Sequence, residues 1–370
     1  MSDMISFSLP YWYDLHAHFR QGTVMADYIQ AHINMACAGI LAMPNTKPPV
    51  SRVTGSAADE YWTIESYLKD LRASGGHVFS DIIVPLYLTQ DTTPDMIRAG
   101  TQSGYLRAAK YYPPHGTTNS DHGFPLRHFM ENGVFSAMEE TGVVLCLHGE
   151  EHGLTGSDYF DQDTNAEDVF YTRHMPVLVQ KFPKLKIVCE HITTRTAVDF
   201  VSAQGDNVCA TVTPQHLLYT AGHLLQGFKY HLYCLPLVKF NADRAALRDA
   251  VTSPTNTRFF AGTDSAPHAV KATACGCAAG CFTGNIAPQL YAQAFEDSGV
   301  DLATKNGQTL FQRFLCDNGP RFYGLKVPDK RFTLKKTPSP VHILTTREGT
   351  DITPLPLGMG QDTLPWTLER

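Results

Sequence analysis

The chain alternates short apolar runs with amphipathic segments along most of its length. Eight runs have the length of a strand, and most are apolar on both faces. This pattern is typical of parallel strands that are covered by helices on both sides. The predicted strands cover residues 11–20, 40–43, 78–88, 105–111, 143–148, 185–191, 208–213 and 258–264.

Helical spacing of apolar residues fills most of the intervals between these strands. The expected helices cover residues 25–36, 57–73, 129–140, 174–181, 194–203 and 243–251, and another begins at Thr93 and Pro94. Eight strand–helix units in roughly 260 residues match the size of a (β/α)8 barrel. An open doubly wound sheet would carry a glycine-rich turn after the first strand, where Phe19, Arg20 and Gln21 stand instead. The sequence therefore predicts an α/β protein with a (β/α)8 TIM barrel over residues 1–325 and a C-terminal segment, residues 326–370, packed on it.

Composition narrows the class of protein and its surroundings. A net charge of −6 provides no basic surface for nucleic acid or for an anionic membrane. No apolar stretch approaches the roughly 18 residues that a membrane helix needs. The N-terminus lacks a basic region followed by an apolar run, so no secretory signal is predicted. Nine cysteines in such a chain favour reduced thiols, and we expect a cytoplasmic protein.

Ionisable side chains stand at the carboxyl ends of the predicted strands. Residues two apart on a strand share a face, so His16 and His18 project together, with Arg20 following in phase. An isolated H-x-H pair is more often two buried histidines than a metal site. Later strands, however, end in the same way, at Lys110, His148, His191 and Asp264. In a barrel these ends converge on one mouth. Nitrogen and carboxylate ligands suit zinc, so a metal site is predicted there.

Lys110 differs from the other members of this set. A protonated lysine cannot bind a metal, and a lysine at a strand end is ordinarily exposed. Beside cationic metals, however, the amine shifts towards its neutral form. A neutral amine reacts with carbon dioxide to give a carbamate, which is a carboxylate able to bridge two metals.

The motifs around these residues resemble those of a known family. H-A-H-F-R, M-P-N, K-Y-Y-P-P-H-G-T-T-N-S, L-H-G-E, E-H-I-T-T and G-T-D-S-A-P-H are similar to signatures of dihydroorotase, in the monofunctional type of bacteria and fungi. The family lies in the amidohydrolase superfamily, and the motifs run in order through residues 14–324. The resemblance implies a cyclic-amide hydrolase that interconverts N-carbamoyl-L-aspartate and L-dihydroorotate in de novo pyrimidine (UMP) biosynthesis.

The resemblance also implies a ligand set for two zinc ions per subunit. One zinc would lie on His16, His18 and Asp264, and the second on His148 and His191, with Lys110, as its carbamate, bridging both. Asp264 would be the catalytic residue as well, because a carboxylate beside the reacting water can take its proton and pass it to the departing nitrogen. A homodimer and a small-molecule substrate are further implications.

Substrate contacts follow from the same resemblance. They are Arg20, Asn45 and His268 for the carboxylate, the backbone of Leu235 and Ala279 for the ring amide, and Thr117 and Thr118 on a mobile loop that closes over the substrate. Residues 275–281 read C-G-C-A-A-G-C, one residue longer than the C-G-C-A-G-C of the bacterial enzymes, so either Ala278 or Ala279 could make the amide contact. The spacing of Cys275, Cys277 and Cys281 is not the C-x2-C of structural zinc sites, which disfavours a structural metal there.

Two other functions share part of these features. Another cyclic-amide hydrolase, such as a hydantoinase or an allantoinase, would have the metal site but less need of a clamp for a substrate carboxylate. A non-catalytic barrel that serves as a scaffold usually loses metal ligands, whereas all six positions are filled here. We therefore expect the dihydroorotase reaction in preference to these two alternatives.

Overall fold

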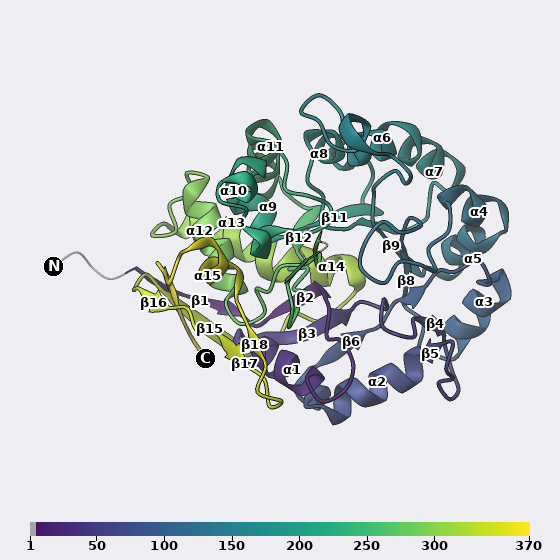
Figure 1. The fold of residues 1–370 in the computed structure, drawn as a ribbon, viewed down its shortest axis with the longest axis horizontal. Helices are drawn as coiled ribbons and strands as arrows, with labels where there is room; N and C mark the ends of the chain where they lie inside the picture. Colours follow the sequence, from purple (N-terminus) through teal and green to yellow (C-terminus); the bar gives the residue numbers. More distant parts are fainter. Residues whose placement is uncertain (1–4, 275) are drawn as a thin grey trace.

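The computed structural model describes residues 5–274 and 276–370, and its centre is a set of parallel strands surrounded by helices (Figure 1). One parallel sheet contains β2 (Trp12–Ala17), β3 (Cys37–Ala42) and β6 (Asp81–Ile83). A second has the order β7 (Leu86–Tyr87), β8 (Ala108–Tyr111), β9 (Val144–Leu147), β10 (Ile187–Cys189), β11 (Val208–Val212) and β12 (Phe259–Ala261). The strands follow one another in chain order, as in a TIM barrel.

The chain just after β12 returns to the end of β2. Ala17 and Ser265 form a parallel bridge, the amide of Asp264 donates to His16 O at 2.8 Å, and that of His18 donates to Ser265 O at 2.9 Å. Residues far apart in the sequence are thereby joined at one end of the strands. The short strands β7 to β12, like β2 and β3, are buried at every position, as the apolar pattern predicted.

The strand predicted over residues 78–88 is interrupted. Residues 76–78 form a short 3-10 helix, and two short strands, β6 and β7, lie on either side of Val84 and Pro85. Proline has no N–H for a sheet ladder, so a continuous strand ends there. The first strand is also shorter than predicted and ends at Ala17.

Helices follow most of the strands and cover their outer side (Figure 1). Those of the first half are α1 (Met25–Asn34), α2 (Ile64–Ala73), α3 (Pro94–Gln102), α4 (Leu126–Glu131), α5 (Val134–Thr141), α6 (Ala166–Arg173) and α7 (Met175–Lys181). Those of the second half are α8 (Arg195–Ser202), α9 (Pro214–Leu218), α10 (Ala221–Leu225), α11 (Asn241–Thr252), α12 (Ala287–Asp297), α13 (Lys305–Gln312) and α14 (Asn318–Tyr323).

Two predicted helices differ in extent from those observed. The helix expected over residues 57–73 begins only at Ile64, because the Thr63 side chain caps it by accepting from Ser66 N. The short strand β5 (Trp62–Thr63) precedes it and pairs with β4 (Val50–Arg52). The helix expected over residues 129–140 is instead the pair α4 and α5, separated by Gly133 with φ 88°. A left-handed residue of this kind ends a helix.

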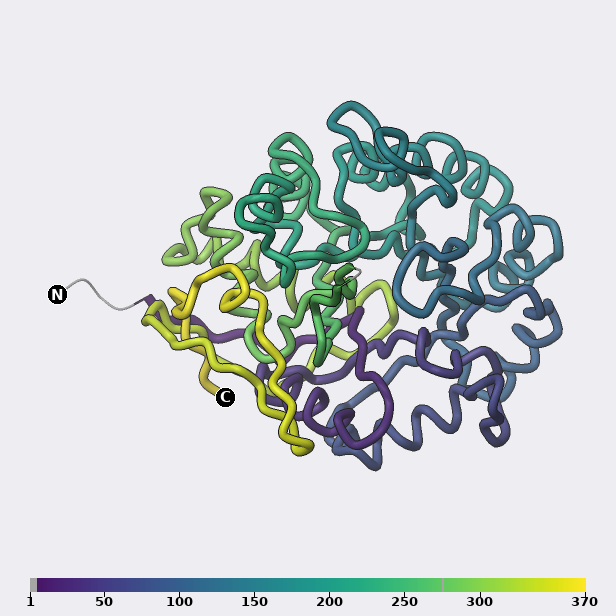
Figure 2. Tube along the Cα trace, viewed as in Figure 1, coloured from purple at the N-terminus to yellow at the C-terminus, as the bar shows by residue number. Residues whose placement is uncertain are grey.

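The C-terminal segment forms a sheet with the N-terminal strand. Strand β1 (Ser6–Pro10) pairs antiparallel with β15 (Arg331–Lys335), which pairs with β20 (Thr367–Glu369). In Figure 2 the purple start and the yellow end of the chain lie side by side. Smaller elements of this region are β16 (Ser339–Pro340), β17 (Leu344–Thr345), β18 (Asp351–Ile352), α15 (Leu355–Met359) and β19 (Thr363–Leu364). A division of domains at residue 325 stays a prediction. In the described part of the chain no helix has the length and apolarity to cross a membrane.

Candidate metal centre and active site

A pocket lies where the carboxyl ends of the strands meet. Among the predicted site residues, those that line it are His16, His18, Arg20, Asn45, Thr117, Thr118, His148, His191, Leu235, Asp264 and Ala279. The two others, Lys110 and His268, lie close behind its wall, in contact with lining residues. The structure thus brings together side chains from strands spread over 250 positions of the sequence, about the full length of a barrel.

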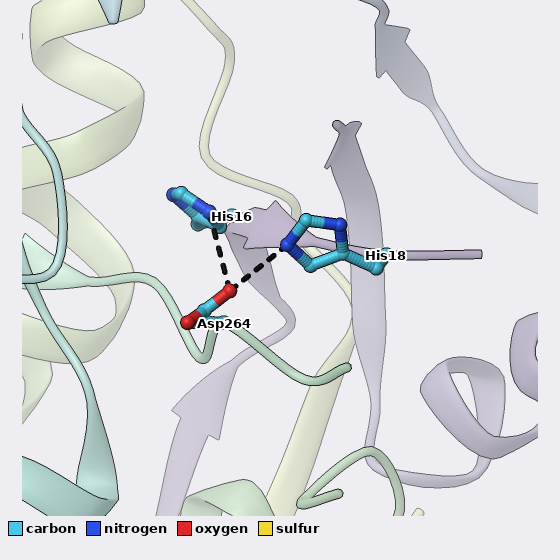
Figure 3. A group of neighbouring side chains, drawn as sticks. All are labelled: His16, His18 and Asp264. Atoms are coloured by element: carbon cyan, nitrogen blue, oxygen red, sulfur yellow. Dashed lines mark hydrogen bonds and ion pairs between the residues drawn. The ribbon is translucent and has the colours of Figure 1, made fainter. Parts of the chain in front are cut away.

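His16, His18 and Asp264 form a compact group at one side of this pocket (Figure 3). Oδ1 of Asp264 lies 3.0 Å from His18 Nε2 and 3.4 Å from His16 Nε2. One ligand atom from each residue lies within 4.8 Å of the others, which is close enough for one cation to bind all three. His16 is on β2, His18 follows it, and Asp264 follows β12.

The protonation of this group suits a metal. Burial lowers the pKa of His18 to about 4, so its imidazole is neutral and has a free lone pair. Burial by itself would raise the pKa of Asp264, but hydrogen bonds from His16 and His18 outweigh it and hold that pKa well below its usual range. Burial also lowers the pKa of His16, yet the Glu190 carboxylate more than offsets this and the net shift is upward. A neutral imidazole and an ionised carboxylate are the forms that bind zinc.

Glutamates orient two of the histidines from behind. Glu190 Oε2 lies 2.7 Å from His16 Nδ1 and also accepts from Thr211 Oγ1 at 2.6 Å. Glu150 Oε2 lies 2.7 Å from His148 Nε2, which leaves Nδ1 as the other nitrogen of that ring. Carboxylates in such positions fix the tautomer and orientation of a ligating histidine. Neither glutamate was predicted, although both stand inside the quoted motifs L-H-G-E and E-H-I-T-T.

The remaining predicted ligands continue the cluster. The ring centroid of His191 lies 4.9 Å from that of His16 and 4.8 Å from that of His148. Lys110, on β8, is fully buried, with Nζ 5.0 Å from the centre of the Tyr112 ring. Burial lowers the pKa values of both Lys110 and His191, the second well below its usual range.

Several polar atoms of the cluster are buried without a hydrogen-bond partner among the described residues. They include Lys110 Nζ, His191 Nδ1 and Glu190 Oε1. Buried polar groups are nearly always paired in folded proteins, and an isolated buried ammonium is costly. The donor set of imidazoles, a carboxylate and an amine therefore fits metal ions, and it fits a modified form of Lys110.

The residues predicted to hold a carboxylate form a second group at the pocket. Arg20 Nε donates to Pro267 O at 3.1 Å, and its NH2 group lies 3.1 Å from His268 Nε2. Burial, and next the Arg20 charge, lower the pKa of His268 to about 3, so this imidazole is neutral. Arg20 reaches the pocket from a left-handed backbone conformation, φ 59°, after the strand has ended at Ala17. The in-phase continuation of the strand that the sequence predicted is therefore wrong.

The segment that contains Thr117 and Thr118 covers the pocket and contacts both of its walls. Asn45 Nδ2 donates to Thr118 O at 2.9 Å, and Asn119 Nδ2 donates to Asn45 O at 3.0 Å. On the other wall, Thr118 Oγ1 donates to Ala279 O at 3.4 Å. The role of this segment as a lid stays a prediction.

The cysteine-containing segment contributes backbone to the pocket. Ala279 and Gly280 line it, and Leu235 lines it from a neighbouring loop. Gly280, Tyr112 and Ala266 were not predicted as lining residues. Cys275 lies outside the described residues, and Cys277 Sγ donates to Tyr230 O at 3.4 Å. Every described cysteine is a free thiol, and none belongs to a group of described residues close enough to share a metal.

Comparison with known proteins assigns the chain to a class of hydrolases. Its structural neighbours include dihydroorotases, which are enzymes of the amidohydrolase superfamily. A dihydroorotase of Shewanella amazonensis is 40% identical over 361 residues, which covers 96% of this chain and 97% of that protein. The chain belongs to the dihydroorotase family.

Solved structures give the same result. A Saccharomyces cerevisiae dihydroorotase in complex with 5-fluoroorotic acid superposes with a TM-score of 0.84 at 27% identity, covering 98% of both chains. An L-hydantoinase of Arthrobacter aurescens has a TM-score of 0.72 at 14% identity over 98% of this chain and 83% of that one, a likeness of fold alone. No protein-family model matches the chain.

Proposed function

We propose that the protein interconverts N-carbamoyl-L-aspartate and L-dihydroorotate at a centre of two zinc ions. The observation that carries this proposal is the convergence of His16, His18 and Asp264 with further nitrogen ligands in one pocket that also contains a guanidinium group. Membership of the dihydroorotase family supports the reaction. A place in cytoplasmic pyrimidine synthesis and a homodimeric assembly are part of the proposal, by resemblance to that family.

The metal ligands would be the six residues of the cluster. His16, His18 and Asp264 would hold one zinc, and His148 and His191 the other, with Lys110 bridging as its carbamate. The buried, unpartnered Nζ of Lys110 and its lowered pKa support the carbamate, because only the neutral amine reacts with carbon dioxide. Metals at such a centre lower the pKa of water and polarise a carbonyl oxygen.

The protein's own groups would handle the proton and the substrate. In hydrolysis a water oxygen forms a bond to the ring amide carbon, and the bond from that carbon to the ring nitrogen breaks. Asp264 takes the proton from the attacking water and returns it to the departing nitrogen. Arg20, Asn45 and His268 bind the carboxylate, and the Arg20 guanidinium can form two parallel hydrogen bonds with it.

The backbone of Leu235 and Ala279 would meet the ring amide, while Thr117 and Thr118 close over the substrate. The lining of the pocket by all four residues supports these roles. A closed lid excludes water from competing with the ring amide for its hydrogen-bond partners. A closed lid would also hold together the residues of several loops that bind the carboxylate.

The decisive experiment combines an assay with metal analysis. Purified protein is expected to hydrolyse dihydroorotate and to contain about two zinc-type ions per chain, with activity lost to a strong chelator and regained on adding metal. Lys110→Ala should lose nearly all activity, and short carboxylic acids should partly restore it. Gentle mass spectrometry should detect the added carbon dioxide. A fully active, metal-free preparation would contradict the proposal.

A hydantoinase-like activity remains the competing function. It would share the metal ligands but would not depend on a substrate carboxylate. Turnover of the same ring without its carboxylate, at a rate equal to that of dihydroorotate, would favour it. The oligomeric state is tested separately by light scattering of the eluting protein, where a dimer is expected.

A further inference from the structure

Lys271 is a buried lysine with its ammonium group enclosed by backbone carbonyls. The residue is 7% exposed, and its Nζ donates to Tyr233 O at 2.7 Å, to Ala278 O at 2.5 Å and to Gly280 O. Three carbonyls match the three N–H donors of a lysine ammonium. Burying a charge is costly unless it is satisfied in this way, so the cage holds its members firmly in place.

The caged carbonyls come from two segments that form one wall of the pocket. Leu235 lines the pocket two residues after Tyr233, and Ala279 and Gly280 line it from the other segment. A backbone hydrogen bond, from Gly280 N to Tyr233 O at 2.9 Å, joins the segments as well. Tyr233 O thus accepts from both Lys271 and Gly280, and the ammonium group lies at their junction.

The same lysine distinguishes the two alanines of C-G-C-A-A-G-C. The amide of Ala278 donates to Lys271 O at 2.8 Å, and the carbonyl of Ala278 accepts from Lys271 Nζ. Both backbone polar groups of Ala278 are therefore committed to Lys271. The next carbonyl, that of Ala279, lies 2.7 Å from His268 Nε2 and accepts from Thr118 Oγ1 at 3.4 Å. Ala279 is the alanine that faces the substrate pocket.

We infer that Lys271 is a positioning residue for substrate recognition. It holds the segments that carry Leu235 and Ala279 at a fixed separation, and by binding Ala278 it selects Ala279 as the residue that meets the ring. Lys271 itself does not line the pocket, so it acts through this backbone. The inference rests on the proposed contacts of Leu235 and Ala279 with the substrate.

The test compares Lys271→Met with Lys181→Met. Methionine keeps the length of the side chain but has no ammonium group. Lys181 is the control, since its Nζ also donates to a backbone carbonyl, Met130 O at 2.7 Å, while it lies on α7 and does not line the pocket. Affinity for 5-fluoroorotate is measured by calorimetry, kcat and KM are measured for dihydroorotate, and bound metal is measured in each protein.

For Lys271→Met we expect 5-fluoroorotate to bind about tenfold more weakly, the scale of losing hydrogen bonds to a charged group. KM should rise by a larger factor than kcat falls, with metal content unchanged. Lys181→Met should keep the affinity of the wild type. Lys271→Arg should recover part of the loss, because a guanidinium group keeps the charge and several donors.

A folded Lys271→Met variant that binds 5-fluoroorotate as tightly as the wild type would overturn the inference. If that variant does not fold, Lys271→Gln takes its place, since its shorter, neutral side chain has only two N–H donors for the three carbonyls. Unchanged affinity in this variant would overturn the inference equally. Failure of the proposed function has a different signature. The wild type would then neither bind 5-fluoroorotate nor hydrolyse dihydroorotate, and the inference would fall with it.

Discussion

Three residues of the pocket adopt left-handed backbone conformations that are rare for residues with a side chain. The φ angles are 59° at Arg20, 40° at His191 and 48° at Asp264. Such a conformation costs on the order of 1–3 kcal/mol and persists only where the surroundings enforce it. At His191 the amide donates to Thr211 Oγ1 at 2.7 Å, and at Asp264 it donates to His16 O. Local strain therefore aims these side chains into the pocket.

Asp14 ties the two segments that carry the first metal ligands. Its carboxylate accepts from Thr263 N at 2.9 Å, from Thr263 Oγ1 at 2.6 Å and from His16 N at 3.3 Å, and it lies 3.0 Å from His32 Nε2. Thr263 immediately precedes Asp264, and Asp14 precedes His16 by two residues. One buried carboxylate thus fixes the relative position of β2 and the segment after β12.

Glu190 provides a first prediction, on metal affinity. Glu190→Gln keeps the shape of the side chain but removes the charge that orients His16 through Nδ1. Zinc should bind about 10–100-fold more weakly, the usual cost of losing a partner of a ligating histidine. Competition with a chelating dye measures it. Glu140→Gln, at an exposed ion pair with Arg98, is the control. Zinc affinity equal to that of the wild type would remove Glu190 from this role.

Arg20 provides a second prediction, on specificity. Arg20→Met should lower kcat/KM for dihydroorotate by about 3–5 kcal/mol, on the scale of losing one partner of a buried charged pair. Metal content should not change, because Arg20 is not a ligand. The same ring without its carboxylate is the control substrate and should be affected little. Equal losses on both substrates would mean that Arg20 supports the pocket generally and does not recognise the carboxylate.

At the scale of residues, the sequence predicts which side chains line the pocket better than it predicts which residues form hydrogen bonds with them. The positions of His16, His148 and His191 follow from strand periodicity and from where apolar runs end. The pairing of Glu190 with His16 joins residues 174 positions apart, and no local pattern encodes it. The prediction that the first strand continues to Arg20 is wrong for the same reason. The partners of Arg20 are Pro267 and His268, which lie 247 and 248 positions away in the sequence.

At the scale of elements, the segment predicted to be a lid contacts the pocket walls through hydrogen bonds of Asn45, Thr118 and Asn119. All three of these bonds are accepted by backbone carbonyls. Most of residues 115–119 are neither fully buried nor part of a helix or strand. Elements with few buried contacts open at little free-energy cost, which is what a lid requires.

The lid provides a third prediction. Changing Thr117 and Thr118 together to Ala removes the hydroxyl that contacts Ala279 O while leaving the backbone bonds in place. The turnover number should fall severalfold or more, whereas the free energy of unfolding should change by only about 1 kcal/mol or less. Steady-state kinetics and denaturant unfolding measure the two quantities. Thr172→Ala, on the exposed side of α6, is the control. An unchanged turnover number would reduce the segment to an ordinary loop.

The existence and type of most elements could be predicted, because a strand buried on both faces and an amphipathic helix have distinct periods. The residues at which these elements begin and end could not be predicted. Thr63 caps α2, which begins at Ile64, seven residues after the start predicted at residue 57 and so about two turns late. Gly133 divides what apolar spacing presents as one helix. Single residues with special backbone geometry decide these ends, and the average pattern of a window does not resolve them.

At the scale of the whole molecule, the two ends of the chain complete one core. Among the described elements, strand β1 does not pair with the barrel strands. It pairs with β15 from the C-terminal segment. Buried residues of both segments, among them Phe7, Phe332 and Trp366, belong to the same hydrophobic cluster as the barrel. The sequence predicted a segment packed on the barrel, but not its pairing with residues 6–10, because antiparallel pairing over this distance leaves no local signal.

Trp366 carries the last prediction, on the stability of the whole molecule. It is fully buried, its ring centroid lies 5.6 Å from that of Phe7, and its Nε1 donates to Glu296 Oε2 on α12 at 2.9 Å. One side chain thus joins the C-terminal segment, the N-terminal strand and a barrel helix. Trp366→Ala should lower the free energy of unfolding by about 3–5 kcal/mol, as large-to-small changes in a core do.

Since the segments share one core with the barrel, we expect the loss to appear as a lower midpoint of the single transition in which activity also disappears. Trp366 does not line the pocket, so kcat at low temperature should stay at the wild-type value. Thermal unfolding followed by fluorescence and by residual activity measures both, and Trp366→Phe, which keeps an aromatic ring against Phe7, should cost less. If an early transition appeared that left activity intact, the C-terminal segment would be an independent unit and the shared core would not be cooperative.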